Sequence, residues 1–442
     1  QHPASMCRGA DEHESVKSED TLLSGSNYAA KELSKPDEWI GELDMEAFRS
    51  DISDLGKKLA NNQGPADVAH LNKIILWSRA CSWIGGLTMW IMLNPISIFL
   101  LSLGTVTRWT IIGHHVCHGG FDKCSKGKFN RFKFGVGSLY RRAVDWLDWM
   151  LVEAWNMEHN QLHHYHLGET DDPDLVEENM DQLREAPIHN IFKYIAVVYM
   201  ACTWKWWYYA PNTYKQLKVN KHRRQGRDVD ETVAKATCTV TLSFIFFGHK
   251  LFSSFEFFSK VLGPYFVQRF IAVPLPFLLL DLVVNKFYPG HGFQYAMNAG
   301  LSLFLAEILT NIHSFIIVAT NHAGDDLYRF DVPCKARSGT FFLRQVISSA
   351  NFTCGTDIID FLHGWLNYQV EHHMWPDLSM LSYQRAQPLV EEICRKHGVP
   401  YIKHNVFWRL KKLTDIMVGN ATMRKYPLAY ENALDTSSAV TN

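Results

Sequence analysis

Histidines gather in three short stretches of the chain. The central stretch, 158–166, reads EHNQLHHYH and holds His159, His163, His164 and His166. His159 and His163 are four residues apart, so on an α-helix they would share one face. His164 is adjacent and could reach a second metal ion from the same turn. Imidazole suits iron, zinc, copper and nickel, so four histidines in eight residues indicate metal binding.

Two further groups of histidines lie elsewhere in the chain. GHHVCHGG at 113–120 repeats the four-residue step, and NYQVEHHMWP at 367–376 contains an adjacent pair. One zinc ion takes about four ligands, so eight or more imidazoles indicate two metal ions. The predicted metal-binding residues are His114, His118, His159, His163, His164, His322, His372 and His373, with His363 and Gln369 as further candidates. His115 and His166 could replace a neighbour in a shifted register or support a ligand by hydrogen bonding.

Four apolar stretches must position these histidines. They cover residues 74–93, 95–112, 267–284 and 295–320, and each is close to the roughly 20 residues that a helix needs to cross a bilayer. Short breaks at Asn94-Pro95 and at 285–294 would make two hairpins. Two hairpins return the chain to its starting side, so all the histidine groups would lie at one membrane face.

The charge pattern orients this arrangement. Lysines and arginines between Lys123 and Arg142 follow the second stretch closely, which by the positive-inside tendency marks the cytosolic or stromal face. We therefore expect an all-α integral membrane protein, with four transmembrane helices in two hairpins and a cytosolic helical cap that holds a histidine-rich dimetal site. Arg141 and Arg142 could also hold a phosphate head group or a CoA, although a role in topology is the favoured interpretation.

The remaining sequence divides into three parts. Residues 1–70 form a polar N-terminal segment with short helices, 71–425 the membrane domain, and 426–442 a loose C-terminal tail. Within the first part, the spacing of apolar residues in Asp44–Leu59 predicts an amphipathic packing helix. The 44 Lys and Arg residues nearly balance 45 Asp and Glu residues, so the overall charge does not favour a nucleic-acid partner.

In order and spacing, the three histidine groups resemble the histidine boxes of the membrane fatty acid desaturase superfamily. His114 and His118 fit the HxxxH box, and His159, His163 and His164 fit HxxxHH. The third group resembles the QxxHH box of front-end desaturases, in which Gln369 takes the place usually held by histidine. The DDPDL sequence at 171–175 is also similar to that group. The resemblance covers residues 75–400.

This resemblance implies a membrane fatty acyl desaturase. Such an enzyme introduces a double bond into an acyl lipid or acyl-CoA, using O2 and two external electrons at a histidine-ligated diiron centre. Unactivated C–H bonds are beyond side-chain chemistry, which agrees with a redox metal. The implied location is the endoplasmic reticulum or a plastid membrane. Partners for the second nitrogen of each ligand imidazole would come from nearby acids, for which the candidates are Glu158, Asp171, Asp172, Asp325 and Glu371.

One departure from the resemblance concerns the electron donor. Many front-end desaturases carry a fused cytochrome b5 domain with an HPGG haem motif, whereas this chain begins with His2, Pro3, Ala4 and Ser5 in a short polar region. We therefore expect a separate donor protein of the cytochrome b5 or ferredoxin type.

Two other activities remain open on the sequence alone. A lipid hydroxylase would use the same metals and differ only in the step after the first hydrogen abstraction. A zinc-dependent membrane hydrolase would need three histidines and an open water position, and the surplus of histidines argues against it.

Overall fold

The computed structural model describes residues 33–430, and within that range the protein is predominantly helical. Residues 1–32 of the predicted N-terminal segment 1–70 and residues 431–442 of the predicted tail 426–442 lie outside the described residues. Of the tail, 428–430 form a single helical turn, and Tyr426 is buried.

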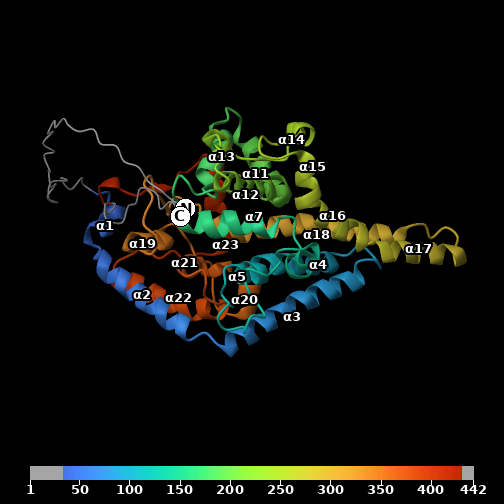
Figure 1. Cartoon of the computed structure of the whole chain (residues 1–442), viewed down its shortest axis with the longest axis horizontal. Helices are drawn as coiled ribbons and strands as arrows, with labels where there is room; N and C mark the ends of the chain where they lie inside the picture. The colour runs from blue at the N-terminus through green and yellow to red at the C-terminus, as the bar shows by residue number, and fades with distance from the viewer. Residues whose placement is uncertain (1–32, 431–442) are drawn as a thin grey trace, which may run out of the picture.

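The first helices wrap the end of the molecule that holds the histidines. They are η1 (Lys35–Asp37), α1 (Glu38–Glu42) and α2 (Met45–Asn61). Helix α2 is the amphipathic helix that the sequence predicted, and it buries Phe48, Ile52 and Leu55. Asp44 caps it by accepting a hydrogen bond from the backbone N–H of Ala47. Figure 1 shows α2 alongside α22 (Met380–Lys396), and the two helices are in contact.

The long helices run away from this end. They include α3 (Pro65–Thr88), α4 (Pro95–Thr107) with its π-helical continuation η2 (Arg108–Gly113), α17 (Leu275–Phe287) and α18 (Gln294–Val318). In Figure 1, α18 and α17 extend horizontally, with α17 at the far right, and α3 runs obliquely below them. Helix α4 packs against both α3 and α18, so it joins the two hairpins.

Within residues 33–430, three helical segments are long and apolar enough to cross a membrane. They are Pro95–Cys117, Ser254–Phe287 and Gln294–Asn321. The first is longer than predicted because the helix continues past residue 112 through His114 and His115. The second is longer because the helix begins at Ser254, well before residue 267. The predicted span 74–93 is instead the second half of α3, which ends at Thr88.

The hairpin of α3 and α4 depends on a close approach at Gly104. A Cβ atom placed there would lie 2.2 Å from the Ser82 Oγ and 3.0 Å from the Ser82 backbone N. Ser78 donates a hydrogen bond to the Gly104 carbonyl across the same contact. Only a residue without a side chain fits between these two helices without moving the backbone.

Gly104→Leu should therefore destabilise the protein, by about 1–3 kcal/mol as expected for overpacking. Thermal unfolding in detergent, followed by tryptophan fluorescence, should show a clearly lower Tm. Gly86→Leu on the facing helix is the matched control, because nothing lies within 4 Å of a Cβ there. Equal melting temperatures for the two variants would contradict this packing.

The shorter elements build the cap around the histidines. From His114 to the start of the segment Ser254–Phe287 they are α5 (His114–Cys117), α6 (Leu139–Arg141), η3 (Arg142–Trp146), α7 (Val152–Glu158), η4 (His159–His163), α8 (His164–His166), α9 (Val176–Asn179), α10 (Asp181–Glu185), α11 (Asn190–Trp204), η5 (Lys205–Tyr209), α12 (Ala210–Arg224), α13 (Glu231–Lys235) and α14 (Leu242–Phe247). The segment Ser254–Phe287 opens with α15 (Ser254–Phe257), η6 (Phe258–Leu262), α16 (Gly263–Val267) and η7 (Gln268–Ala272).

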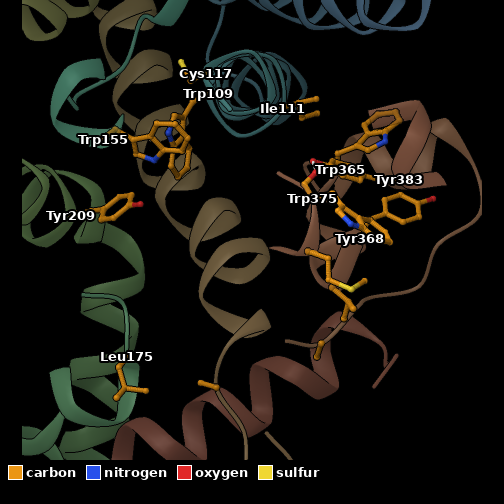
Figure 2. Close-up of a cluster of buried hydrophobic side chains, with 14 of the residues drawn as sticks. Trp109, Ile111, Cys117, Trp155, Leu175, Tyr209, Trp365, Tyr368, Trp375 and Tyr383 are labelled. Carbon is orange, nitrogen blue, oxygen red and sulfur yellow. Dashed lines mark hydrogen bonds between the residues drawn. The ribbon is translucent and has the colours of Figure 1, made fainter. Parts of the chain in front are cut away.

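After α18 the chain returns to the cap. The elements there are η8 (Ala319–Asn321), β1 (Tyr328–Arg329), α19 (Gly339–Ile347), α20 (Asp357–Leu362), η9 (Leu366–Tyr368), α21 (Gln369–Met374), α22, α23 (Val406–Val418), β2 (Arg424–Lys425) and η10 (Leu428–Tyr430). Strands β1 and β2 pair in parallel, with Tyr328 opposite Arg424. The main hydrophobic core of the cap is rich in aromatic side chains, and Figure 2 shows Trp155, Tyr209 and Trp365 within it.

Arg142, one of the two arginines considered for a head group, has a structural position. It is buried, and its guanidinium donates hydrogen bonds to backbone carbonyls of η6 and of the 148–150 turn, including Val261 O at 2.5 Å and Lys260 O at 2.7 Å. Arg141 forms an ion pair with Asp145. Arg142 therefore joins the cap to the segment Ser254–Phe287.

Candidate metal centre

The eight predicted imidazoles come together in the structure as two adjacent groups. Group one contains His114, His118, His159, His164 and His372, and group two contains His163, His322 and His373. Within each group the candidate ligand nitrogens all lie within 4.8 Å of one another. All eight side chains are buried except that of His322, which is partly exposed. The two groups adjoin at the stacked rings of His164 and His373, whose centroids are 4.2 Å apart.

The spacing of the nitrogens in group one fits a shared metal ion. The Nε2 atom of His114 lies 2.9 Å from that of His372 and 3.3 Å from that of His159, and the Nε2 atoms of His159 and His164 are 3.3 Å apart. Ligand nitrogens about 2.1 Å from one metal ion would be roughly 3.0–3.4 Å apart at octahedral or tetrahedral angles. The buried Nε2 atom of His118 has no hydrogen-bond partner among the described residues, which a metal ion would supply.

A π-helical turn explains how the central histidines divide between the groups. On an α-helix His159 and His163 would share one face, but η4 has the wider π geometry, in which residue i bonds to i+5. His159 is consequently aligned with His164, five residues on, and both belong to group one. His163 belongs to group two, and it also remains close to His159, with which it forms a further candidate group that includes Asp174. By contrast, His114 and His118 keep the α-helical step, with the His118 N–H bonded to the His114 carbonyl at 3.0 Å.

Gln369 completes group two. Its side-chain amide nitrogen lies 2.8 Å from His322 Nε2 and 3.1 Å from His373 Nε2, while its Oε1 is buried without a partner among the described residues. Rotating the amide by 180° exchanges oxygen and nitrogen within the same space and would turn the carbonyl oxygen towards the imidazoles. Gln369 thus occupies a position where it could add an oxygen ligand to three imidazoles.

His363, the other further candidate, does not join either group. Its Nδ1 bonds the Ile359 carbonyl at 2.8 Å, and its ring packs against Phe352. His115 likewise bonds the Ile111 carbonyl, and His166 forms an ion pair with Glu169. All three side chains therefore have a local partner and belong to neither group. His115 still adjoins the centre, because its ring stacks on that of His114 with centroids 5.1 Å apart.

Few of the groups that contact the second ring nitrogen of these imidazoles are the predicted acids. Asp172 is one of them: its Oδ1 lies 2.8 Å from His163 Nδ1 and also accepts the Asp174 N–H, and its Oδ2 accepts the Gly168 N–H at 3.0 Å. Burial alone would raise the pKa of Asp172. The opposing effect of His163 and these N–H groups is larger, so the pKa of Asp172 lies below its usual value. Asp172 is therefore a fixed anion that keeps a proton on His163 Nδ1 and leaves Nε2 free.

The other predicted acids differ in their roles. Asp171 and Asp325 are exposed and form ion pairs with Lys235 and Lys412. Glu371 is buried, and burial raises its pKa to about 7, but it bonds Asn351 and Tyr401 rather than an imidazole.

Glu158, the remaining predicted acid, is fully buried beside His159. Burial raises its pKa well above the usual value, and Asp174 and Asp172 raise it further. Tyr209 donates a hydrogen bond to it at 3.4 Å. A carboxyl group held neutral in this way adds no negative charge next to group one.

Three partners at the centre were not predicted from the sequence. The Ser348 carbonyl faces His322 Nδ1 at 3.3 Å, and the Tyr383 hydroxyl faces His372 Nδ1 at the same distance. Asp174 offers a carboxylate close to both His159 and His163. The DDPDL sequence contained a signal for Asp174, whereas nothing local marks Ser348 or Tyr383, because their contacts depend on the tertiary fold.

An apolar pocket opens onto both groups. His114 and His159 of group one and His163 and His322 of group two form part of its wall. The remaining wall is mostly aromatic and aliphatic and includes Trp109, Trp155, Met200, Trp204, Tyr209, Phe315, Leu413 and Met417. Trp155 stacks on His159 with ring centroids 4.5 Å apart, and Figure 2 shows Trp109, Trp155 and Tyr209 around this part of the core. The pocket suits an apolar chain passing beside the histidines.

A sequence model of the fatty acid desaturase family matches residues 88–405, most of the chain and all ten candidate metal-binding residues. The chain belongs to the fatty acid desaturase family. It is 21% identical over 392 residues to the NADPH-dependent stearoyl-CoA 9-desaturase of Mycobacterium tuberculosis, a match that covers 85% of this chain and 81% of that protein.

Shorter matches have higher identity. Fatty acid desaturase 3 of Bos taurus is 42% identical over 108 residues, covering 24% of this chain and 23% of the relative. The Delta(8)-fatty-acid desaturase of Euglena gracilis is 34% identical over 101 residues, covering 23% of each chain. No solved structure matches. The relatives are oxidoreductases, and this member of the family is an oxidoreductase as well.

Proposed function

We propose that this desaturase introduces a double bond into a fatty acyl chain, using O2 and two external electrons at a histidine-held pair of iron ions. The pocket carries the proposal, because a single apolar channel is bordered by imidazoles of both groups. An acyl chain in it would pass beside two metal positions at once. A hydrolase with one zinc ion has no use for the second group.

The residues of the two groups have distinct tasks. Group one would hold one iron ion, and group two with Gln369 would hold the other. Two iron ions supply the O2 and redox chemistry that side chains lack. Neutral imidazoles leave such a centre less negative than carboxylates would. Asp172 orients His163 through its Nδ1, and the Ser348 carbonyl does the same for His322.

The pocket wall positions the substrate and excludes water. Trp155, Trp109 and Tyr209 are buried, so an acyl chain between them would be held away from solvent close to group one. Fixing a methylene pair in this way supplies orientation, which is a large part of the rate for a reaction of an unactivated chain. The substrate class is an acyl lipid or an acyl-CoA, and the relatives include enzymes named for each.

The proposed topology places the centre just outside the membrane. Helix α3 would add a fourth crossing to the three long apolar segments, since it pairs with α4 along much of its length. The cap would then face the cytosol or stroma, in the endoplasmic reticulum or a plastid membrane. Electrons would come from a separate protein of the cytochrome b5 or ferredoxin type.

Lipid analysis of a host that expresses the chain tests the activity. Gas chromatography with mass spectrometry should find a new double bond that is missing from a host expressing His163→Ala, His164→Ala. Its position along the chain gives the regiochemistry. A new hydroxy acid in place of the alkene would contradict desaturation and identify a hydroxylase on the same centre.

Met417→Trp tests the assignment of the pocket to the acyl chain. Met417 is buried on α23 and lines the pocket, so a larger side chain there shortens or blocks the channel. Conversion of the native substrate should fall about tenfold or more, because small displacements of a bound chain are costly, while bound iron stays unchanged. Phe407→Trp, on an exposed part of the same helix, is the control and should behave like the wild type. Unchanged conversion by Met417→Trp would place the acyl chain elsewhere.

A further inference from the structure

A second groove lies on the outside of the long helices, apart from the metal centre. It is bordered by α3, by α4 with η2, and by the part of Ser254–Phe287 around η7. Its floor is apolar and includes Met89, Leu101, Val273, Phe277 and Leu303. Three arginines, Arg79, Arg108 and Arg269, also line it.

Two of these arginines have no carboxylate partner among the described residues, and the third has an unpartnered nitrogen. Neither Arg79 nor Arg108 has a carboxylate partner within 4 Å among the described residues, and Arg108 has only a 3.5 Å contact with the Ala143 carbonyl. Arg269 is 92% buried, since 8% of its surface is exposed. Its Nε pairs with Glu307 at 3.0 Å, but its Nη2 is buried with no hydrogen-bond partner among the described residues. A buried guanidinium nitrogen without an acceptor is costly, which points to a missing anion.

One acid also lines the groove, and it is already engaged. Asp145 forms an ion pair with Arg141 at 2.6 Å and accepts the Gly135 N–H at 3.0 Å. The groove therefore keeps an excess of positive charge beside an apolar floor.

The depth of Arg269 matches a lipid phosphate. Arg269 precedes the end of α17 at Phe287 by 18 residues, or about 27 Å of helix, close to the roughly 30 Å thickness of a hydrocarbon core. It therefore lies near one membrane interface, at the end of the long helices nearer the histidines.

We propose that this groove binds one anionic glycerophospholipid, whose phosphate is held by Arg79, Arg108 and Arg269. The acyl chains lie along the apolar floor between α3 and α17. A bound lipid here contacts both long hairpins and is not a substrate, because the groove and the catalytic pocket share none of their lining residues.

Native mass spectrometry of the full chain in detergent tests the proposal, with equal amounts of dioleoylphosphatidylglycerol and dioleoylphosphatidylcholine as probes. The wild type should retain one phosphatidylglycerol with a preference of about tenfold or more, as expected for two or more unscreened arginines. Arg79→Gln, Arg108→Gln should lose that preference. Arg224→Gln, Arg395→Gln removes the same charge from exposed positions elsewhere and should keep it.

A second variant separates lipid binding from folding. Gly86 lines the groove, and a Cβ there meets nothing within 4 Å, so Gly86→Leu fills the space of the acyl chains without touching the arginines. It should also lose the bound lipid. Equal retention of both lipids by the wild type, retention by Gly86→Leu, or displacement of the lipid by inorganic phosphate would each overturn the proposal.

Discussion

His164→Ala should abolish double-bond formation and remove at least one of the two iron ions. His164 lies where the two groups meet: its Nε2 is 3.3 Å from His159 Nε2, and its ring stacks on His373. Alanine leaves a gap in the ligands of group one and removes the ring that supports group two. The product should fall below detection, and metal analysis should show the loss of iron.

His363→Ala is the control for this prediction. His363 belongs to the same C-terminal stretch as His372 and His373 but bonds only the Ile359 carbonyl among the described residues. Its removal should leave the iron content at the wild-type level and most of the activity. If His363→Ala were inactive and His164→Ala active, the assignment of histidines to the two groups would be wrong.

Asp172→Asn should weaken the centre without removing any ligand. The amide keeps the size of the carboxylate but cannot supply its charge to His163 Nδ1, and an N–H turned towards that nitrogen would favour the opposite tautomer. Loss of such a partner typically costs 10–100-fold in metal affinity or activity. We expect a loss of turnover in that range, together with faster loss of iron to a chelator.

The neighbouring residue provides a matched comparison. Asp171→Asn changes the same functional group one position away, but Asp171 is exposed and paired with Lys235. Its turnover and chelator sensitivity should stay within about twofold of the wild type, since exposed ion pairs contribute little. A similar loss in both variants would mean that the acidity of the loop matters, and not the contact with His163.

The histidine content of the centre could be predicted from sequence, but its internal arrangement could not. Residue type and density were enough to select eight imidazoles, all of which the structure brings together. Their division into groups depended on the π-helical geometry of η4, which moved His163 to the group opposite His159. Hydrogen bonds in a π turn are a property of the packed helix, and the local sequence did not indicate them.

Supporting contacts were harder to predict than the clustering of the histidines. Asp172 and Asp171 are adjacent acids with the same local context, and only the fold turns one towards His163 and the other towards solvent. Tyr383 reaches His372 from α22, and that contact is tertiary. The helix boundaries show the same limit. Helix α3 begins at Pro65, well before its apolar half, and its start is marked by Asp67, which accepts a hydrogen bond from the Gly64 N–H, and not by hydropathy.

The metal content of the purified, active chain tests the central claim most directly. Mass spectrometry of the metals in a preparation that forms the double bond should find about two iron ions per chain, one for each histidine group. About one zinc ion per chain, with no iron, would contradict a paired iron centre and favour the hydrolase alternative.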